Sequence, residues 1–301
     1  MSTPFLSICI PTYNRVGYLK KCLKSVLAQV TDEVEVVVED NCSTDGTEEW
    51  MKTMSDPHVR YIRNQENVGL VNNVIQIIAN AKGQYVYMLT DDDYLLINGI
   101  EDTIRFAKQT KCLAFKTAYF LHNEVSKSGA HVSLFPRNMS QPDMTEQNAA
   151  KLYIESNILT GLVFSKEIFD EKRMRDNSHN WYPSLLLVGL AGLNVGYLSD
   201  PTNVHIWENE TYWGISPEKR DELNRGQVET LLYLINEKKI TKKYYLELAK
   251  AHINKFLFEK NERLNEPLND SERKQLADHA AKIKRSDSIR KFKATLKRLL
   301  P

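Results

Sequence analysis

Cysteine is scarce in this sequence, and its few copies show no pairing pattern. The four cysteines are Cys9, Cys22, Cys42 and Cys112, without a CxxC pair or a neighbouring histidine cluster. A disulfide scaffold needs closely spaced cysteines in even number, and a structural zinc site needs paired ligands. The sequence therefore argues against both, and it favours a reducing, cytoplasmic compartment.

Long apolar runs and an excess of charge of one sign are also absent. The sequence has no run of about 18 apolar residues, the length that a membrane-spanning helix needs. Its start, MSTPFLSICIPTYNR, lacks the charged region and cleavage site of a signal peptide. We expect a protein that stays in the cytosol, where it can still lie on the inner face of the membrane. The formal net charge of +1 argues against a nucleic-acid-binding protein.

The first hundred residues alternate between short apolar runs and amphipathic segments. The apolar runs, which predict strands, are Phe5–Ile10, Val34–Val38, Val59–Ile62 and Gln84–Leu89. The amphipathic segments, which predict helices, are Tyr18–Val30, 47–54 and 70–81. Strands that are apolar throughout and alternate with helices are typical of a parallel sheet covered on both faces. In such α/β folds the ligand binds beyond the carboxyl ends of the strands.

The rest of the sequence changes character near residue 215. Before that point three further strands and one buried helix are predicted, at Leu113–Lys116, Leu162–Ser165, Val195–Leu198 and Ser184–Leu193. After it, long amphipathic segments that are rich in polar residues span 217–237, 241–264 and 271–299. We therefore predict one α/β domain over residues 1–215 and a helical C-terminal region over residues 216–301.

Four consecutive predicted strands end in polar, turn-forming clusters. The clusters are Pro11-Thr12-Tyr13-Asn14-Arg15, residues 39–47, Asn67-Val68-Gly69 and Thr90-Asp91-Asp92-Asp93-Tyr94. Because the carboxyl ends of parallel strands lie at one edge of a sheet, these clusters are expected to converge. Their convergence is the main physical argument for a site at this edge.

Three consecutive carboxylates, Asp91, Asp92 and Asp93, are the most distinctive feature of that edge. Adjacent anions repel, and at the end of a buried strand a cation is needed to offset their charge. Mg²⁺ and Mn²⁺ prefer oxygen ligands, and such ions are often bound by one or two carboxylates together with substrate phosphates. A solvated acidic turn or a helix N-cap is the alternative interpretation. The position directly after an apolar run favours the metal site.

Taken together, the four motifs resemble those of the family-two glycosyltransferases. They are LSICIPTYNR, VVVEDNCSTDGT, the N-x-G at 67–69 and GQYVYMLTDDDYLLINGIE, in this order. The resemblance is strong over residues 5–110 and weak over residues 111–215. It implies a GT-A fold, with a Rossmann-like, mostly parallel sheet flanked by helices. It also implies transfer of a sugar, with inversion, from a nucleotide-diphosphate donor, of which UDP is the commonest.

The resemblance assigns donor-site roles to individual residues. Pro11 and Tyr13 match positions that pack against the nucleotide base, and Asp40 matches a carboxylate that hydrogen-bonds the base. Asp91 and Asp92 match the acidic motif that faces the ribose and the metal, with Asp92 as the direct ligand of Mn²⁺ or Mg²⁺. Two alternatives stay open, because Tyr13 can simply cover the sheet edge and Asp40 can cap the turn that follows it.

The resemblance assigns four further positions to the donor and metal site. Asp93 supports Asp92 or shares its role, while Asn67 and Asn73 match polar positions that line the donor pocket. His205 follows the last predicted strand of the domain and is a candidate third contact to the metal or the diphosphate. A structural role is the alternative for each of the two asparagines and for the histidine.

The catalytic base does not follow from the motifs. Inversion by single displacement needs a carboxylate or a histidine that accepts the proton of the acceptor hydroxyl. Family members place an acid just before a helix in the second half of the domain, but residues 180–185, Asn-Trp-Tyr-Pro-Ser-Leu, contain none. The nearest candidates are Asp176 and His179, followed by Glu208 and Glu210. The missing acid leaves open a non-catalytic nucleotide-sugar or glycan-binding protein.

The C-terminal segment 271–300 is basic and amphipathic. One apolar stripe, formed by Ile289, Phe292, Leu296 and Leu299, is surrounded by lysine and arginine. Such a helix can lie in a membrane interface, which would suit a lipid-linked glycan acceptor, or it can pack its stripe on the catalytic domain. A nucleotidyltransferase is a weaker alternative function, because it would need a glycine-rich basic loop and PTYNRVGYLKK holds one glycine.

Overall fold

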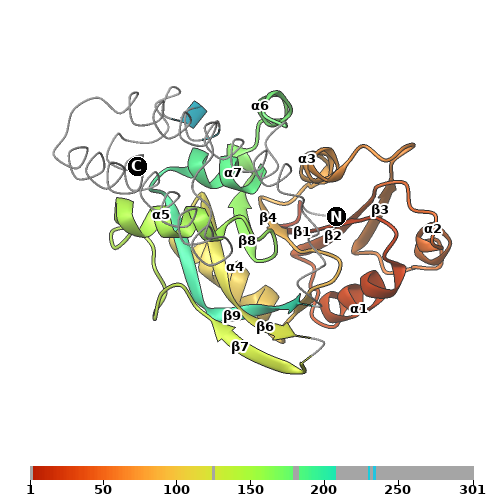
Figure 1. The fold of residues 1–301 in the computed structure, drawn as a ribbon, viewed down its shortest axis with the longest axis horizontal. Helices are drawn as coiled ribbons and strands as arrows, with labels where there is room; N and C mark the ends of the chain where they lie inside the picture. Colours follow the sequence, from red (N-terminus) through yellow and green to blue (C-terminus); the bar gives the residue numbers. More distant parts are fainter. Residues whose placement is uncertain (1–2, 124–125, 179–182, 208–229, 231–232, 235–301) are drawn as a thin grey trace, which may run out of the picture. The chain divides into compact units, whose positions relative to one another are not determined.

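The computed structural model describes residues 3–123, 126–178, 183–207, 230 and 233–234 (Figure 1). The strands are β1 (Leu6–Thr12), β2 (Val34–Asp40), β3 (Val59–Arg63), β4 (Tyr85–Met88), β5 (Tyr94–Leu95), β6 (Ala114–Asn123), β7 (Ser128–Val132), β8 (Leu162–Ser165) and β9 (Val195–Trp207). The α-helices are α1 (Val16–Leu27), α2 (Thr47–Met51), α3 (Leu70–Asn80), α4 (Gly99–Thr110), α5 (Glu146–Glu155), α6 (Glu171–Asp176) and α7 (Pro183–Ala191). A 3-10 turn, η1 (Lys166–Ile168), follows β8.

All of these strands belong to one sheet, in the order β3-β2-β1-β4-β8-β6-β9-β5, with β7 paired to β6. The strands β1 to β4 are parallel to one another. β8 then runs antiparallel to both β4 and β6, and β9 is again parallel to β6. The short strands β5 and β7 are antiparallel to β9 and β6. Most strands therefore point the same way, as the sequence predicts.

The parallel half of the sheet is covered on both faces. Every residue of β1 and β4 is buried, which a strand exposed to water on one face could not be. Helices α1 and α3 lie on opposite sides of these strands (Figure 1). Helix α1 buries Leu19, Cys22, Leu23 and Val26, at the spacing that places them on one face of a helix. This packing holds the carboxyl ends of the strands in fixed positions.

Strands β6 and β9 are much longer than the sequence predicts. The expected strand at Val195–Leu198 was followed by Asp200-Pro201, which has the composition of a turn. In the structure β9 continues, because a register shift places Leu198 opposite Thr117 and Pro201 opposite Ala118. The intervening residues form a bulge instead of ending the strand. The bulge carries β9 onward as far as the acidic motif.

Several strands and α-helices were not predicted from the sequence: β5, β7, α4, α5 and α6. β5 pairs with the far end of β9, so it depends on a contact between residues more than a hundred positions apart, such as Tyr94 and Val204. Helix α4 did carry a sequence signal, since Ile100, Ile104 and Ala107 are buried at helical spacing. Gly99 begins α4 against β9, where a Cβ atom would lie 2.5 Å from the Thr202 carbonyl oxygen.

The predicted C-terminal helical region lies almost wholly outside the described residues. Thr230, Tyr233 and Leu234 are helical, within the segment predicted as helix at 217–237, and Leu234 packs on Gly189 of α7. The predicted boundary near residue 215 and the basic segment 271–300 fall outside the described part and stay predictions. Within the part that is described, no helix combines the length and apolar character needed to cross a bilayer.

Candidate active site

Loops after β1, β2 and β4 meet at one edge of the sheet, where the sequence predicts that their polar clusters converge. Thr12, the last residue of β1, connects the three loops. Its carbonyl oxygen accepts from the Asn41 N–H at 2.9 Å, and its hydroxyl donates to Asp91 Oδ2 at 2.7 Å. The ends of β2 and β4 are thereby fixed to the end of β1.

The loop between β1 and α1 is held in a defined shape by the loop after β2. Asn14 has a positive φ of 54°, a conformation that asparagine tolerates better than most residues. Its N–H donates to Ser43 Oγ at 2.8 Å, and its side-chain oxygen accepts from the Thr44 N–H at 2.7 Å. Asp45 accepts from the first N–H of α1, that of Val16, at 2.8 Å. These contacts fix the backbone on either side of Tyr13 and Arg15.

Asp91 and Asp92 share one cation, the guanidinium of Arg15. Arg15 Nη1 donates to Asp91 Oδ1 and to Asp92 Oδ2, each at 2.9 Å. Burial raises the pKa of Asp91 to about 6, although Arg15 and the Thr12 hydroxyl both lower it. The Asp92 side chain is more open, with 15% exposed against 5% for Asp91. The two carboxylates are therefore a compensated pair, and Asp92 is its accessible member.

Asp93 has other partners than that pair and ties the acidic motif to β9. Its Oδ2 accepts from the Thr90 hydroxyl at 2.8 Å and lies 2.9 Å from His205 Nδ1, while its Oδ1 accepts from the Ile206 N–H at 2.8 Å. Asp93 is fully buried. Its observed contacts are those of a support for His205, and its predicted contact with the donor stays a prediction.

His205 contacts the acidic motif through Asp93, and its predicted contact with a metal or a diphosphate stays a prediction. Burial lowers its pKa, but the hydrogen bond and charge of Asp93 outweigh burial, so the pKa of His205 is raised overall. Because the carboxylate accepts from Nδ1, the ring is oriented and Nε2 is the nitrogen left for another partner. A carboxylate behind one ring nitrogen is the usual support of a metal-binding histidine.

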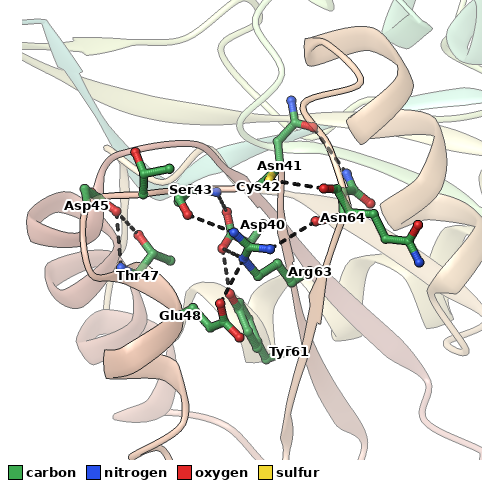
Figure 2. A network of polar contacts seen from close by, with 12 residues as sticks. Asp40, Asn41, Cys42, Ser43, Asp45, Thr47, Glu48, Tyr61, Arg63 and Asn64 are labelled. Atoms are coloured by element: carbon green, nitrogen blue, oxygen red, sulfur yellow. Dashed lines mark hydrogen bonds and ion pairs between the residues drawn. The ribbon is translucent and has the colours of Figure 1, made fainter.

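Asp40 lies at the centre of a separate polar network, shown in Figure 2. Its Oδ1 accepts from the Ser43 N–H at 2.9 Å and its Oδ2 accepts from the Tyr61 hydroxyl at 2.6 Å. Burial and the Asp40 charge raise the pKa of Tyr61, so the phenol stays protonated and donates. Asp40 is itself fully buried, and the structure therefore shows it organising the loop after β2. Direct contact with a base stays a prediction.

Arg63 completes this network from β3. Its Nη2 donates to the Ser43 carbonyl oxygen at 3.1 Å, and its Nε lies 3.2 Å from Glu48 and 3.7 Å from Asp40 (Figure 2). One arginine thus holds the loop after β2, the start of α2 and the buried carboxylate together.

The two asparagines predicted to line the donor pocket belong to a chain of amides. Asn41 Nδ2 donates to Asn67 Oδ1 at 2.8 Å, and Asn64 Nδ2 donates to Asn73 Oδ1 at 2.8 Å. Asn73 also donates to the Glu39 carbonyl oxygen and is buried. The structure places both residues in the support of the loops, and their contact with a donor stays a prediction.

Pro11 and Tyr13 differ in their access to a ligand. Pro11 lies within β1 and is buried, whereas Tyr13 follows the strand with 44% of its surface exposed. An exposed aromatic ring on a rigid loop offers a stacking surface for a planar base. Of the two, Tyr13 is the residue that a ligand can reach without a rearrangement of the sheet.

The candidates for the catalytic base are not brought to this edge by the described contacts. Asp176 ends α6, has 58% of its side chain exposed, and pairs with Lys172 at 2.6 Å. His179, Glu208 and Glu210 lie outside the described residues. The role of base therefore stays a prediction for Asp176 and His179.

The site can provide part of the ligand set of a divalent ion. Asp91 and Asp92 offer carboxylate oxygens that converge on one point, and His205 offers Nε2. The described residues contain no group of three or more acidic, histidine or cysteine side chains already arranged around a metal. An ion that takes one or two carboxylates and completes its shell with phosphate and water fits this arrangement.

Comparison with known proteins identifies the family. The sequence profile of glycosyl transferase family 2 matches residues 7–172, which is more than half of the chain. The chain belongs to glycosyl transferase family 2. The match covers the loops after β1 to β4 and all three consecutive aspartates.

Several bacterial relatives of this family 2 chain are themselves named as sugar transferases. The chain is 29% identical over 168 residues to the putative colanic acid biosynthesis glycosyl transferase WcaA of Escherichia coli, covering 54% of this chain and 57% of WcaA. It is 38% identical over 96 residues to the abequosyltransferase RfbV of Salmonella typhimurium, covering 30% of this chain and 28% of RfbV. The chain thus spans less than two thirds of these relatives.

The fold of this family 2 chain is also that of a solved structure. The crystal structure of S. aureus TarS 1-349 in complex with UDP-GlcNAc superimposes with a TM-score of 0.65 at 18% identity, covering 83% of this chain and 72% of the TarS chain. The GT-A fold predicted from the sequence is thereby confirmed.

No role was predicted from the sequence for Arg15, Thr12, Tyr61 or Arg63, which hold this family 2 site together. Arg15 is the last residue of the motif PTYNR. Because three neighbouring carboxylates repel one another, a positive side chain was to be expected at the same edge of the sheet. That requirement was a signal for Arg15. Tyr61 and Arg63 lie on β3, whose sequence, VRYIR, does not show which side chains face the neighbouring loop.

Proposed function

We propose that this chain transfers a sugar, with inversion, from a nucleoside-diphosphate donor to a hydroxyl of a glycan or lipid-linked glycan. UDP is the favoured donor nucleotide, since a protein of the same fold was crystallised with UDP-GlcNAc. The name of WcaA, a putative colanic acid biosynthesis glycosyl transferase, supports an acceptor in polysaccharide synthesis. The observation that carries the proposal is the convergence of Asp91 and Asp92 on Arg15, in a loop that also carries the exposed Tyr13.

Each part of the donor has a suitable partner at this edge. The Tyr13 ring stacks on the base, and the loop that Asp40 and Tyr61 hold in place receives the nucleoside. Asp92, with His205 through Nε2, would hold Mn²⁺ or Mg²⁺. A bound ion of this kind neutralises the charge that develops on a leaving diphosphate. Inversion requires that a base on the acceptor side take the hydroxyl proton, and Asp176 and His179 are the candidates.

The location of the protein and its contact with a membrane are part of the same proposal. The basic segment 271–300 would place the enzyme on the cytoplasmic face of a membrane, next to a lipid-linked acceptor. This segment lies outside the described residues, so the proposal rests on its sequence alone.

Thermal unfolding with a panel of nucleoside diphosphates tests the donor site. Wild type is expected to be stabilised by UDP with Mn²⁺ or Mg²⁺ and much less with a chelator. At a concentration 100-fold above Kd the gain is about 2.7 kcal/mol, which raises Tm by several degrees. Asp92→Ala is expected to lose the metal-dependent part of the gain. Asp143→Ala, which removes a carboxylate from a surface ion pair with Arg137, is the matched control and should respond as wild type does.

Slow hydrolysis of the donor separates catalysis from binding. An active transferase is expected to release nucleoside diphosphate from UDP-sugar even without acceptor, and Asp92→Ala should abolish this release. Binding without any release would favour the alternative, a non-catalytic nucleotide-sugar-binding protein. If no nucleotide stabilises the wild type under any metal condition, the proposed donor site is wrong.

A further inference from the structure

We propose that Arg15 is a resident counter-cation of the Asp91–Asp92 pair and competes with the divalent ion for its place. On this view, donor binding exchanges one cation for the other, and the released guanidinium then binds the diphosphate. The inference deepens the proposed function and rests on it for the identity of the donor.

The first support is the position of a single nitrogen atom. Arg15 Nη1 lies 2.9 Å from Asp91 Oδ1 and 2.9 Å from Asp92 Oδ2, so the two carboxylates converge on it. A divalent ion held by both of these carboxylates would need the position that the guanidinium now occupies. The ion and Nη1 are therefore alternative occupants, and one must leave before the other can bind both carboxylates.

The second support is the charge at this point. The Asp91 and Asp92 side chains are 5% and 15% exposed, so water screens their repulsion poorly. Two neighbouring carboxylates need a cation whether or not a donor is bound, and Arg15 supplies it when metal is absent. A divalent ion must therefore overcome an existing ion pair, and this competition reduces its affinity for the nucleotide-free protein.

The third support is that the side chain can move while its backbone stays fixed. Asn14, Ser43 and Asp45 hold the main chain around Arg15 through their hydrogen bonds. The guanidinium lies 4.9 Å from the centre of the Tyr18 ring, and its side chain is 21% exposed. Rotation about the bonds of its stem would carry it off the carboxylates while the main chain stays in place. A displaced guanidinium at the same edge can then bind phosphate oxygens, for which its planar set of donors is well suited.

Titration with Mn²⁺ alone, followed by the electron paramagnetic resonance signal of the free ion, measures the competition without any activity. In nucleotide-free protein, Arg15→Gln is expected to bind Mn²⁺ on the order of tenfold more tightly than wild type, because a competing positive charge is gone. Arg15→Lys keeps the charge and should fall between the two. Arg137→Gln removes an arginine from a surface ion pair and should match wild type. Circular dichroism of each variant checks that it is folded.

Two further measurements locate the effect and complete the test. The double variant Arg15→Gln/Asp92→Asn should lose the gain in Mn²⁺ affinity, which places the ion on the acidic pair. With saturating Mn²⁺, Arg15→Gln should bind UDP on the order of tenfold more weakly than wild type, because a phosphate contact is lost.

Two outcomes would overturn the proposal. One is Mn²⁺ binding by folded Arg15→Gln that is no tighter than in wild type, and the other is a gain that survives Asp92→Asn. Failure of the proposed donor site would look different, since UDP would then not bind the wild type at any metal concentration. The comparison of Mn²⁺ affinities without nucleotide would still decide the role of Arg15.

Discussion

The buried carboxylates of the site are stabilised by different partners, and the difference predicts their roles. Asp40 and Asp93 are fully buried, and each oxygen of both accepts at least one hydrogen bond from the protein. Asp91 and Asp92 share a guanidinium that an incoming cation can replace. Asp40 and Asp93 each accept from a backbone N–H and so order the loops around them, whereas the pair held by the side chain of Arg15 is suited to bind a ligand.

The hydrogen bond from Tyr61 to Asp40 is expected to contribute strongly to stability. Tyr61→Phe leaves a buried, charged acceptor without this donor, and we expect a loss of about 1.5–3 kcal/mol in the free energy of unfolding. Tyr85→Phe is the matched control, because the Tyr85 hydroxyl donates at 3.1 Å to the neutral Cys112 carbonyl oxygen and its loss should cost about 1 kcal/mol. Urea unfolding measures both. Equal losses would show that Asp40 does not depend on Tyr61.

The three aspartates show how far residue roles could be predicted from the sequence. Their position after a buried strand indicated that a cation must compensate them, and Arg15 does so for two of them. Their different roles could not be predicted, because Asp91 accepts a hydrogen bond from Thr12 of β1 whereas Asp93 contacts His205 of β9. Which neighbour each side chain meets depends on strands far away in the sequence.

At the scale of secondary structure elements, the turn before β8 is closely packed between β4 and β6. The Gly161 N–H donates to the Met88 carbonyl oxygen of β4, and its own carbonyl oxygen accepts from the Thr117 N–H of β6. Gly161 thus bridges the parallel strands and the second half of the sheet. Its φ of +78° is a conformation that residues with a side chain rarely adopt.

Gly161→Ala is expected to destabilise the protein by about 2–4 kcal/mol, from backbone strain and overpacking together. An added Cβ atom would lie 2.6 Å from Thr117 Oγ1 and 2.8 Å from Asn203 Nδ2, inside a buried hydrogen-bonded cluster. Gly17→Ala in α1 is the control. It meets nothing within 4 Å, so it should leave stability unchanged or raise it by up to about 1 kcal/mol. If Gly161→Ala and Gly17→Ala have the same Tm in thermal unfolding, this explanation of the turn is wrong.

The elements that the sequence predicted well are those with local signals. The apolar runs and helical periodicities of residues 5–89 are local, and the structure places β1 to β4 and α1 to α3 close to their predicted limits. β9 was predicted to end at Leu198, because Asp200-Pro201 reads as a turn. Its bulge opposite Ala118 depends on pairing with β6, which no window of sequence around residue 200 contains.

At the scale of the whole molecule, the site combines residues from two halves of the sheet. The positions of the residues from the first half could be predicted from the sequence, and those from the second half could not. The parallel strands supply the loops of Thr12, Asp40 and Asp91, all visible in the sequence as polar clusters after apolar runs. The second half supplies His205 through a long strand whose course only the folded sheet determines. The candidates for the catalytic base, Asp176 and His179, also belong to this second half of the sequence, where no motif fixes their spacing.

The free energy of unfolding of the metal-free protein is expected to depend on pH, because Asp91 is buried and its charged form is disfavoured. Its folded pKa of about 6 lies above the ordinary value of about 3.9, so the folded state binds this proton more tightly than the unfolded state. The resulting stability is fully present below about pH 4 and is lost as the pH rises through 6. A shift of about 2 units corresponds to about 3 kcal/mol.

Urea unfolding from pH 4.5 to pH 7.5, with a chelator present, tests this expectation against Asp91→Asn, whose side chain does not titrate. Relative to that variant, the wild type should lose on the order of 2 kcal/mol across the range, with most of the loss complete by pH 7. Parallel profiles would mean that Arg15 and Thr12 compensate the buried charge completely. Because a divalent ion compensates the same charge, adding Mn²⁺ in place of the chelator should reduce the loss above pH 6, when Asp91 is ionised and able to bind the ion.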